Sequence, residues 1–108
     1  MTQFDKRNLS MMMDFYEMTM SYGYFHQPNR DVRVAFDLFF RSVPDKGGYA
    51  IFAGLQHVIE FVENLSFSDA DIAYFRKQNL FSEEFLDFLR GFRFRGDIYA
   101  MPEGTIIY

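Results

Sequence analysis

A run of methionine and aromatic residues, MMMDFYEMTMSYGYF, occupies residues 11–25 and limits what the start of this chain can form. Its apolar positions recur at helical spacing and cover most of the girth of a helix, which is typical of a helix buried on several sides. The pattern predicts a helix over residues 9–25, with Asn8 or Ser10 as its N-cap. Pro28, in the sequence HQPNRD that follows, prevents the helix from continuing.

Two acidic residues, Asp14 and Glu17, interrupt this apolar run. One interpretation is a buried helix that happens to carry two acids. The other is a functional segment that presents Asp14 and Tyr16 to something outside the chain. The residues of the run leave both interpretations open.

Residues 31–41, DVRVAFDLFFR, change the pattern from helical spacing to alternation. Apolar residues at every second position predict a strand with one apolar face. Arg33, Asp37 and Arg41 then share the opposite, polar face. The next segment, SVPDKGG at 42–48, is predicted to be a loop because of its proline, aspartate and paired glycines.

Three further helices are predicted in the second half of the chain. Regularly spaced apolar residues indicate a helix over about 49–64. Ser68, with Asp71 three residues later, forms a capping-box pattern that starts the next helix. Ser82 stands in the N-cap position of the last helix, and Gly91 is placed to end it.

The segment RGDIYAMPEGTIIY at 95–108 predicts two short strands around a turn at 102–104. Its last residues, TIIY, begin an apolar strand that reaches Tyr108 without a polar residue to end it. We therefore expect the chain to be part of a longer protein; the alternative is a terminal strand that simply ends there. Together the segments predict an α+β domain over residues 1–108, with helices packed on a small, mostly antiparallel sheet.

The composition is that of a folded domain, and it excludes several classes of function. A net charge of −4 argues against a nucleic-acid partner, because phosphate binding needs a dense basic face. The chain has no cysteine, so disulfides and thiolate metal sites are excluded. It shows no signal peptide and no apolar stretch near the ~20 residues of a membrane span, so we expect a cytoplasmic protein without a membrane partner. Fifteen Phe and seven Tyr provide a sizeable core, an apolar surface for a partner, or both.

The residues alone indicate no self-contained catalytic site. His26 and His57 are the only histidines, and neither has metal-binding spacing around it. A P-loop and a dinucleotide-binding fingerprint are both lacking. The KGG sequence at 46–48 offers backbone N–H groups for an anion, but an ordinary loop is the simpler interpretation. We therefore predict no metal site, no cofactor site and no catalytic residue within the chain itself.

Four segments in a fixed order resemble one family of enzymes. These segments are MMMDFYEMTM, VAFDLFFRSVPDKGGYAIFAGLQHVIEFVENL, the helix that follows, and FSEEFLDFLRGFRFRGDIYAMPEGTIIY. From Asn8 to Tyr108 the chain is similar to the amino-terminal region of nicotinate phosphoribosyltransferase. Each piece is weak by itself, but the ordered set is specific, and FDLFFR and GGYAIFAGL favour this family over the related quinolinate phosphoribosyltransferase.

The resemblance implies an enzyme that makes nicotinate mononucleotide and pyrophosphate from nicotinate and 5-phosphoribosyl 1-diphosphate, with ATP hydrolysis, for the salvage of nicotinate into NAD. It implies Mg²⁺ and ATP for the full-length enzyme, and a homodimer whose site is shared across the interface. The family's α/β barrel takes roughly 200 residues or more and would follow this domain. Its phosphoribosyl-binding residues and phosphorylated histidine would lie beyond Tyr108, so neither His26 nor His57 is assigned that role. We expect the amino-terminal piece to be inactive alone.

The resemblance also implies three substrate-binding residues. Tyr16 corresponds to a tyrosine that stacks on the pyridine ring in a neighbouring subunit's site, and Asp14 is its acidic neighbour. Arg41 corresponds to a basic residue near the phosphate groups. The structural alternatives are a core tyrosine, a helix-capping aspartate and a surface arginine paired with Asp37. One departure from the family is Met13, where threonine is usual.

A second hypothesis from a different class remains. The chain would then be a complete α+β interaction module that binds a protein partner through its aromatic face. A module of this kind predicts a monodisperse, cooperatively folding protein. An amino-terminal piece of an enzyme predicts self-association instead, because the apolar surfaces that would face the barrel are larger than monomers normally expose.

Overall fold

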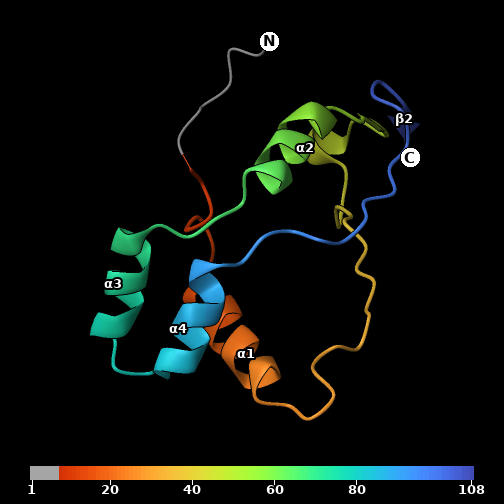
Figure 1. Cartoon of the computed structure of the whole chain (residues 1–108). Coiled ribbons are helices and arrows are strands. Elements are labelled where there is room, and N and C mark those ends of the chain that lie inside the picture. The colour runs from red at the N-terminus through yellow and green to blue at the C-terminus, as the bar shows by residue number, and fades with distance from the viewer. Residues whose placement is uncertain (1–7) are drawn as a thin grey trace.

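The computed structural model describes residues 8–108, which form helices, a short 3-10 turn and one pair of short strands (Figure 1). This content confirms the predicted combination of helices with a small antiparallel sheet. In chain order the elements are α1 (Phe15–Phe25), η1 (Pro44–Lys46), β1 (Ala50–Ile51), α2 (Leu55–Glu63), α3 (Asp69–Lys77), α4 (Glu83–Arg90) and β2 (Ile106–Ile107).

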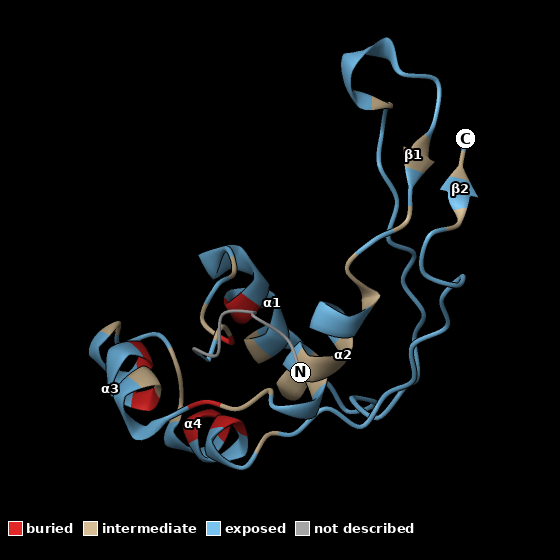
Figure 2. Cartoon of the chain, turned by 90° about the horizontal axis from the view of Figure 1, so that it is seen from above, coloured by how far each residue is buried: buried red, intermediate tan, exposed pale blue. Residues whose placement is uncertain are grey.

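The buried core lies between helices and not on the sheet. Figure 2 shows the buried positions gathered on α1, α3, α4 and the segment that leads into α3. The prediction that the helices pack on the sheet is therefore wrong, since neither strand contributes a buried residue. The buried hydrophobic residues are Met18, Phe67, Ile72, Phe75, Phe85, Leu86 and Leu89.

Aromatic rings fill the space around this core. The Phe85 ring lies 5.1 Å from that of Tyr22 and 5.4 Å from that of Phe25, so it joins α4 to α1. Phe81 lies 5.6 Å from Phe75 and 5.5 Å from Phe85, which joins the end of the α3–α4 connection to both helices. Several of these pairs meet edge-on, the arrangement that the charge distribution of aromatic rings favours. Part of the aromatic content therefore serves the core.

The predicted starts of α3 and α4 are confirmed. The Ser68 hydroxyl accepts a hydrogen bond from the Asp71 backbone N–H at 3.1 Å, and the Asp71 carboxylate accepts one from the Ser68 N–H at 2.9 Å. This is a complete capping box. The Ser82 hydroxyl caps α4 by accepting from the Phe85 N–H at 3.3 Å, and Gly91 follows the last residue of that helix.

The first helix is shorter and more exposed than predicted. It begins at Phe15 with Asp14 as N-cap, and its only buried residue is Met18. Asn8 and Ser10 do not cap it. They bind Ser66 instead: the Asn8 side-chain amide donates to the Ser66 carbonyl at 2.8 Å, and the Ser66 N–H donates to the buried Ser10 hydroxyl at 3.1 Å. This contact holds the segment before α1 against the segment before α3.

The sheet differs from the predicted one because its two strands are far apart in sequence. The helix predicted over 49–64 begins only at Leu55, and β1 lies in the part that was predicted to be its first turns. β1 pairs antiparallel with β2, in the register Ala50 with Ile107 and Ile51 with Ile106. The turn at 102–104 forms, but the predicted strand before it does not. A hairpin around that turn was therefore the wrong pairing.

The predicted strand at 31–41 is also wrong. This segment is extended but unpaired, and its large apolar side chains lie in solvent, with Phe36 90% and Leu38 95% exposed. Within residues 8–108, no backbone hydrogen bond involves Arg33 to Arg41. The alternating pattern is real, but a strand requires a neighbouring strand, and the described residues provide none. The predicted loop at 42–48 is confirmed, and it contains η1.

The chain is consequently open in shape. Its radius of gyration is 16.9 Å, whereas a compact domain of this length has about 13 Å. In Figures 1 and 2 the helical core and the β1–β2 pair lie at opposite ends of the molecule, joined by extended segments. Among residues 8–108, no helix has the length and apolar content that crossing a membrane requires.

Candidate functional site

Asp14 stands at the point where the extended chain enters α1. Its backbone is extended (φ −75°, ψ 144°), and its carbonyl accepts a hydrogen bond from the Glu17 N–H at 3.1 Å. Its side chain makes no capping hydrogen bond and is exposed. The carboxylate is therefore not used to cap this helix, although the residue occupies the N-cap position.

Tyr16 lies in the first turn of α1 with its side chain turned to solvent. It is 59% exposed, which places it outside the helical core of this structure. Its backbone carbonyl accepts a hydrogen bond from the Thr19 hydroxyl at 2.9 Å, a contact within the helix. No aromatic ring among residues 8–108 stacks on the Tyr16 ring. More than half of the side chain is therefore open to another molecule.

Met13, which stands where the family usually has threonine, has a packing role here. It is partly buried and packs against the helical core. A methionine side chain is flexible enough to fill irregular space between aromatic rings. The residue just before Asp14 thus anchors the start of α1, while Asp14 and Tyr16 face outward.

Arg41 lies at the end of the extended segment and is exposed. Neither Arg41 nor Asp37 forms an ion pair within the described part of the chain, so the alternative of an Arg41–Asp37 pair is not observed. Figure 1 shows the end of this extended segment apart from α1. A single copy of the chain therefore brings Asp14 and Tyr16 together on one helix but does not bring Arg41 to them.

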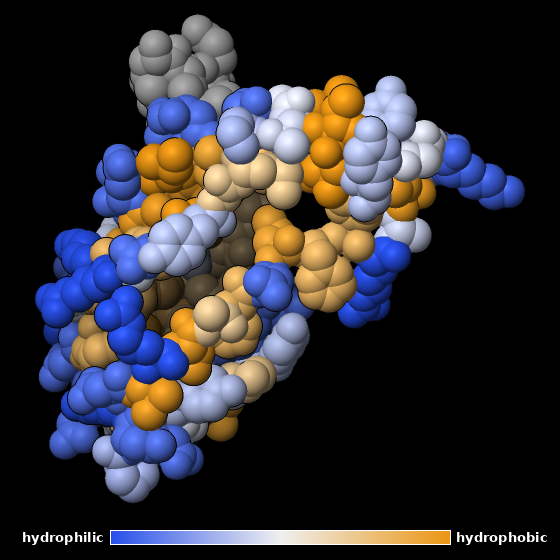
Figure 3. All heavy atoms as spheres, turned by 90° about the vertical axis from the view of Figure 1, so that its right-hand side faces the viewer, coloured by the Kyte–Doolittle hydropathy of each residue, from blue (hydrophilic) through white to orange (hydrophobic). Residues whose placement is uncertain are grey.

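The residues also form an open apolar hollow of about 590 Å³ beside α1 and α4 (Figure 3). Apolar side chains of both helices line it, and Glu17, Arg30 and Asp31 stand among them as charged groups. Arg30 makes two contacts with Phe25. The Arg30 guanidinium lies 4.6 Å from the centre of the Phe25 ring, and it donates a hydrogen bond to the Phe25 carbonyl at 3.3 Å. Asp14, Tyr16 and Arg41 do not line the hollow. Sequence reasoning missed it because it forms between segments that are far apart in the chain.

Metal binding finds no support in the described residues. Among residues 8–108, no three His, Asp or Glu side chains lie close enough together to hold a metal ion. Arg76 and Glu83 form a bidentate ion pair at 2.8 and 2.9 Å between α3 and α4, and their hydrogen bond raises the pKa of Arg76 and lowers the pKa of Glu83. This pair joins two core helices and does not belong to the α1 site.

The fold and these side chains define a small α+β domain. Asp14 and Tyr16 are exposed at the start of α1, and Arg41 is exposed at the end of the extended segment. The sequence model of the nicotinate phosphoribosyltransferase (NAPRTase) N-terminal domain matches residues 11–108. The chain belongs to the nicotinate phosphoribosyltransferase family.

Individual relatives agree with this assignment. The chain is 41% identical over 99 residues to nicotinate phosphoribosyltransferase pncB2 of Mycobacterium tuberculosis, an alignment that covers 92% of the chain and 21% of the relative. It is 37% identical over 105 residues to nicotinate phosphoribosyltransferase of Bacillus subtilis, covering 97% of the chain and 21% of the relative. The Caenorhabditis elegans enzyme of the same name is 37% identical over 103 residues, covering 91% and 18%. The chain thus spans about a fifth of the length of these curated relatives.

Proposed function

We propose that this chain is the amino-terminal domain of a nicotinate phosphoribosyltransferase. The full-length enzyme would join nicotinate to 5-phosphoribosyl 1-diphosphate, release pyrophosphate, hydrolyse ATP and so supply nicotinate mononucleotide for NAD synthesis. The observation that carries the proposal is the family match over residues 11–108, together with an α1 that exposes Asp14 and Tyr16. The domain lacks the length of the curated relatives, so we propose that it is inactive alone.

Tyr16 is the residue we assign to the pyridine ring. A pyridine carrying a carboxylate is a flat, electron-poor ring, and a phenol face packs well on it, worth about 0.5–1.5 kcal/mol beyond the area buried. The exposure of the Tyr16 ring supports this role, because a core tyrosine has no free face to offer. Its position in the first turn of a helix that is held by Met13 and Met18 limits the directions in which the ring can point.

Asp14 is assigned a different task because of its charge. A carboxylate beside the nicotinate carboxylate would repel it, so direct contact between the two is unfavourable. The Asp14 side chain is exposed and makes no capping bond, which leaves its oxygens available as acceptors. We assign them to a ribose hydroxyl or to a basic group that itself meets the substrate.

Arg41 is assigned to phosphate groups. Its guanidinium has the planar pair of donors that binds phosphate oxygens in a bidentate manner. Because Arg41 lies apart from α1 within one copy, the proposal places it in a site of the partner subunit of a homodimer. Mg²⁺ and ATP are assigned to the rest of the longer enzyme, since the described residues offer no donor set for a metal ion.

The test is an assay of two proteins. The full-length protein that carries this domain should form nicotinate mononucleotide from nicotinate, 5-phosphoribosyl 1-diphosphate and ATP, and should require all three for full turnover. The chain of residues 1–108 should form none under the same conditions. A folded full-length protein without product would overturn the proposal. We also expect the activity in the cytoplasmic fraction.

One observation favours a second candidate, a protein-interaction module. The apolar hollow and the exposed side chains of residues 32–40 are surfaces that a protein partner would cover. Under this alternative the isolated chain is monodisperse and melts cooperatively, and removing Tyr16 has no effect on pyridine chemistry. The family match makes the enzyme the better supported function.

A further inference from the structure

Two side chains fasten the segment before α1 to the segment before α3. The Asn8 side-chain amide donates to the Ser66 carbonyl at 2.8 Å, and the Ser10 hydroxyl accepts from the Ser66 N–H at 3.1 Å. Both backbone groups of Ser66 are thus bonded, as they would be by a neighbouring strand, but here the partners are side chains. Figure 1 shows the segment before α1 crossing the connection between α2 and α3. We call these contacts of Asn8 and Ser10 with Ser66 the polar clamp.

The polar clamp is rigid on the side of α1. Ser10 is only 3% exposed, so its hydroxyl meets the Ser66 N–H away from water. The Asn8 side-chain oxygen also accepts from the Ser10 N–H at 2.9 Å, which fixes the turn between these two residues. Removing the Ser10 hydroxyl would leave a backbone N–H without its partner, and an unpaired buried group of this kind is costly.

The polar clamp is equally fixed on the side of α3. Phe67, the residue after Ser66, is buried in the helical core, where its ring lies 6.2 Å from that of Phe75. Ser68 follows at once and forms the capping box of α3. Ser66 therefore belongs to a stretch of backbone that the core and a helix cap both hold in place.

A short, folded connection leads from the polar clamp to Asp14. Within it the Met12 N–H donates to the Leu9 carbonyl and the Met13 N–H donates to the Met11 carbonyl, both at 2.9 Å. Met11 and Met13 also pack against the helical core. The connection is consequently a compact turn and not a flexible tether.

Asp14 and Tyr16 lie between two buried anchors, Ser10 before them and Met18 after them. Asp14 makes no capping hydrogen bond, so the first turn of α1 is not fixed by a cap of its own. The two anchors therefore determine the direction in which this turn points. Met18 is held by apolar packing alone, whereas Ser10 is held by directional hydrogen bonds.

We propose that Asn8 and Ser10 are positioning residues for the pyridine substrate. The polar clamp orients the first turn of α1 and so places the Tyr16 ring where nicotinate binds. This inference rests on the function proposed above for Tyr16. Asn8 and Ser10 do not contact nicotinate themselves; they act through Tyr16.

Steady-state kinetics of the full-length protein test the proposal. Ser10→Ala removes the acceptor of the Ser66 N–H and should raise the KM for nicotinate about fivefold, because the Tyr16 ring remains but is misplaced. The KM for 5-phosphoribosyl 1-diphosphate should stay unchanged. Ser21→Ala is the matched control, since the Ser21 hydroxyl donates only to the Glu17 carbonyl within α1. Ser10→Thr keeps the hydroxyl and should recover at least part of the loss.

Asn8→Asp provides a second variant that changes no buried side chain. An aspartate keeps the oxygen that accepts from the Ser10 N–H but loses the donor to the Ser66 carbonyl. Asn8 is exposed, so this variant carries the test if Ser10→Ala does not fold. It should raise the KM for nicotinate to a similar degree, with the helical circular dichroism unchanged.

A double-mutant cycle with Tyr16→Ala separates positioning from stability. If the polar clamp acts through the Tyr16 ring, Ser10→Ala or Asn8→Asp raises the KM for nicotinate in the wild type but adds nothing once the ring is absent. A clamp that only stabilises the fold would have the same effect in both backgrounds. It would also lower the thermal midpoint and the folded fraction without selecting one substrate.

Each outcome decides the question. We expect a nicotinate KM that both clamp variants raise, that Ser10→Thr recovers, and that neither clamp variant changes when Tyr16 is alanine. A wild-type KM in the folded clamp variants, with a raised KM in Tyr16→Ala, overturns this inference and leaves the role of Tyr16 intact. Equal effects in both backgrounds overturn it in favour of a purely structural clamp. A wild-type KM in Tyr16→Ala itself overturns the role of Tyr16, and this inference with it.

Discussion

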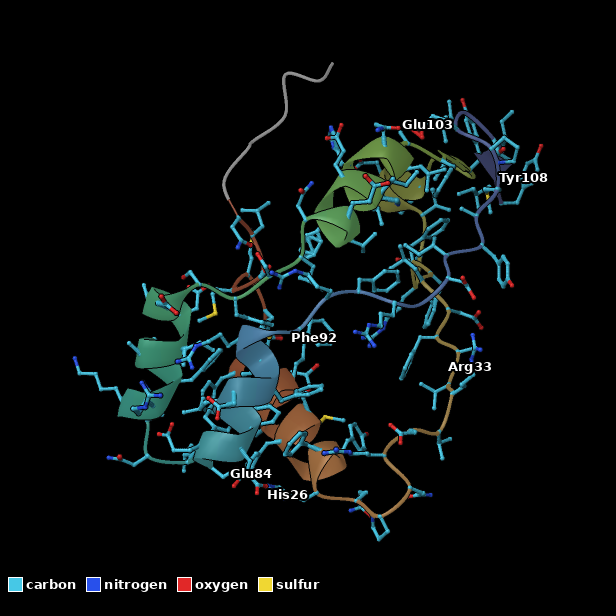
Figure 4. All side chains as sticks on the ribbon, viewed as in Figure 1. His26, Arg33, Glu84, Phe92, Glu103 and Tyr108 are labelled. Atoms are coloured by element: carbon cyan, nitrogen blue, oxygen red, sulfur yellow. The ribbon has the colours of Figure 1, made fainter. Side chains whose placement is uncertain are left out.

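The Glu103 carboxylate caps α2 from 49 residues away, by accepting one hydrogen bond from the Gly54 N–H at 2.6 Å and another from the Leu55 N–H at 3.2 Å (Figure 4). Gly54 is the N-cap residue of α2 and has φ +105°, a conformation that favours glycine. It has no side chain with which to cap the helix itself. The turn before β2 therefore provides the acceptor, and the negative charge lies at the helix end that favours it.

Replacing Glu103 by alanine should loosen α2 and the β1–β2 pair together. Loss of an N-cap acceptor costs about 1 kcal/mol of unfolding free energy. Amide hydrogen exchange should show faster exchange at Gly54 and Leu55 in Glu103→Ala, with Glu103→Gln intermediate. Glu63→Ala, at the other end of α2, is the control and should leave both amides unchanged. Unchanged exchange in Glu103→Ala would show that the cap does not hold this helix.

The helical core should depend on Leu86 far more than on Leu80. Leu86 is fully buried between the helices, whereas Leu80 lies exposed in the α3–α4 connection. Leu86→Ala removes buried apolar atoms and leaves a cavity, at a cost of about 2–5 kcal/mol. Leu80→Ala should cost less than about 1 kcal/mol. Urea unfolding followed by far-UV circular dichroism measures both, and equal losses would contradict the packing described above.

The Arg76–Glu83 pair should give the stability a particular pH dependence. The hydrogen bond from Arg76 lowers the pKa of the Glu83 carboxyl below its ordinary value of 4.5. A carboxyl with a lowered pKa in the folded state stabilises the fold at pH values above its unfolded pKa. That contribution is lost as the pH falls through the lowered, folded-state pKa. The thermal midpoint of the wild type should therefore fall more steeply below about pH 4.5 than that of Glu83→Gln.

Glu84→Gln is the control for this pH dependence. Glu84 is the neighbouring acid in the first turn of α4 and has no ion pair within residues 8–108. Its removal should leave the acid limb of the stability curve as steep as in the wild type. If Glu83→Gln and Glu84→Gln both made the loss of stability at acid pH less steep, and to the same degree, the helix dipole and not the contact with Arg76 would be the cause.

Local signals were sufficient for the parts of the fold that neighbouring residues determine. The capping box of Ser68 and Asp71 and the cap at Ser82 were predicted correctly because donor and acceptor lie three residues apart. The strand at 31–41 was not, because alternation describes a side-chain pattern while a strand also needs a neighbour. The β1–β2 pair joins Ala50 to Ile107 and Ile51 to Ile106, and the cap of α2 joins Gly54 to Glu103; no local pattern reports contacts between residues so far apart in the chain.

In the candidate site, too, local sequence patterns predicted some features, while others depend on how the chain packs. The apolar girth of residues 11–25 predicted a helix buried on several sides, yet only Met18 of α1 is buried. The residue pattern had left Asp14 and Tyr16 open as outward-facing residues and had put Arg41 on a polar face, but their substrate roles came from the family resemblance. A signal for the Glu103 cap was present in the sequence: α2 begins after Gly54, without a Ser, Thr, Asp or Asn at the cap. A helix without a cap of its own suggests an acceptor supplied from elsewhere.

Arg41 should affect the phosphate-bearing substrate and not nicotinate. In the full-length protein, Arg41→Ala should raise the KM for 5-phosphoribosyl 1-diphosphate by about tenfold to a hundredfold, the loss expected for hydrogen bonds to a charged group. Arg41→Lys should recover part of this loss, because it keeps the charge but not the bidentate geometry. Arg95→Ala, another exposed arginine, is the control. An effect on the KM for nicotinate alone would contradict the assignment.

The central claim is that the Tyr16 ring, presented by α1, stacks on the pyridine ring of nicotinate. The most direct measurement is the KM for nicotinate of the full-length protein carrying Tyr16→Ala. Tyr16→Phe is measured beside it, and the control is Tyr74→Ala, another helical tyrosine that is about half exposed. We predict that Tyr16→Ala raises this KM about tenfold with the helical circular dichroism unchanged, while Tyr16→Phe, which keeps the ring, and Tyr74→Ala stay near the wild-type value. A wild-type KM for nicotinate in folded Tyr16→Ala would contradict the claim.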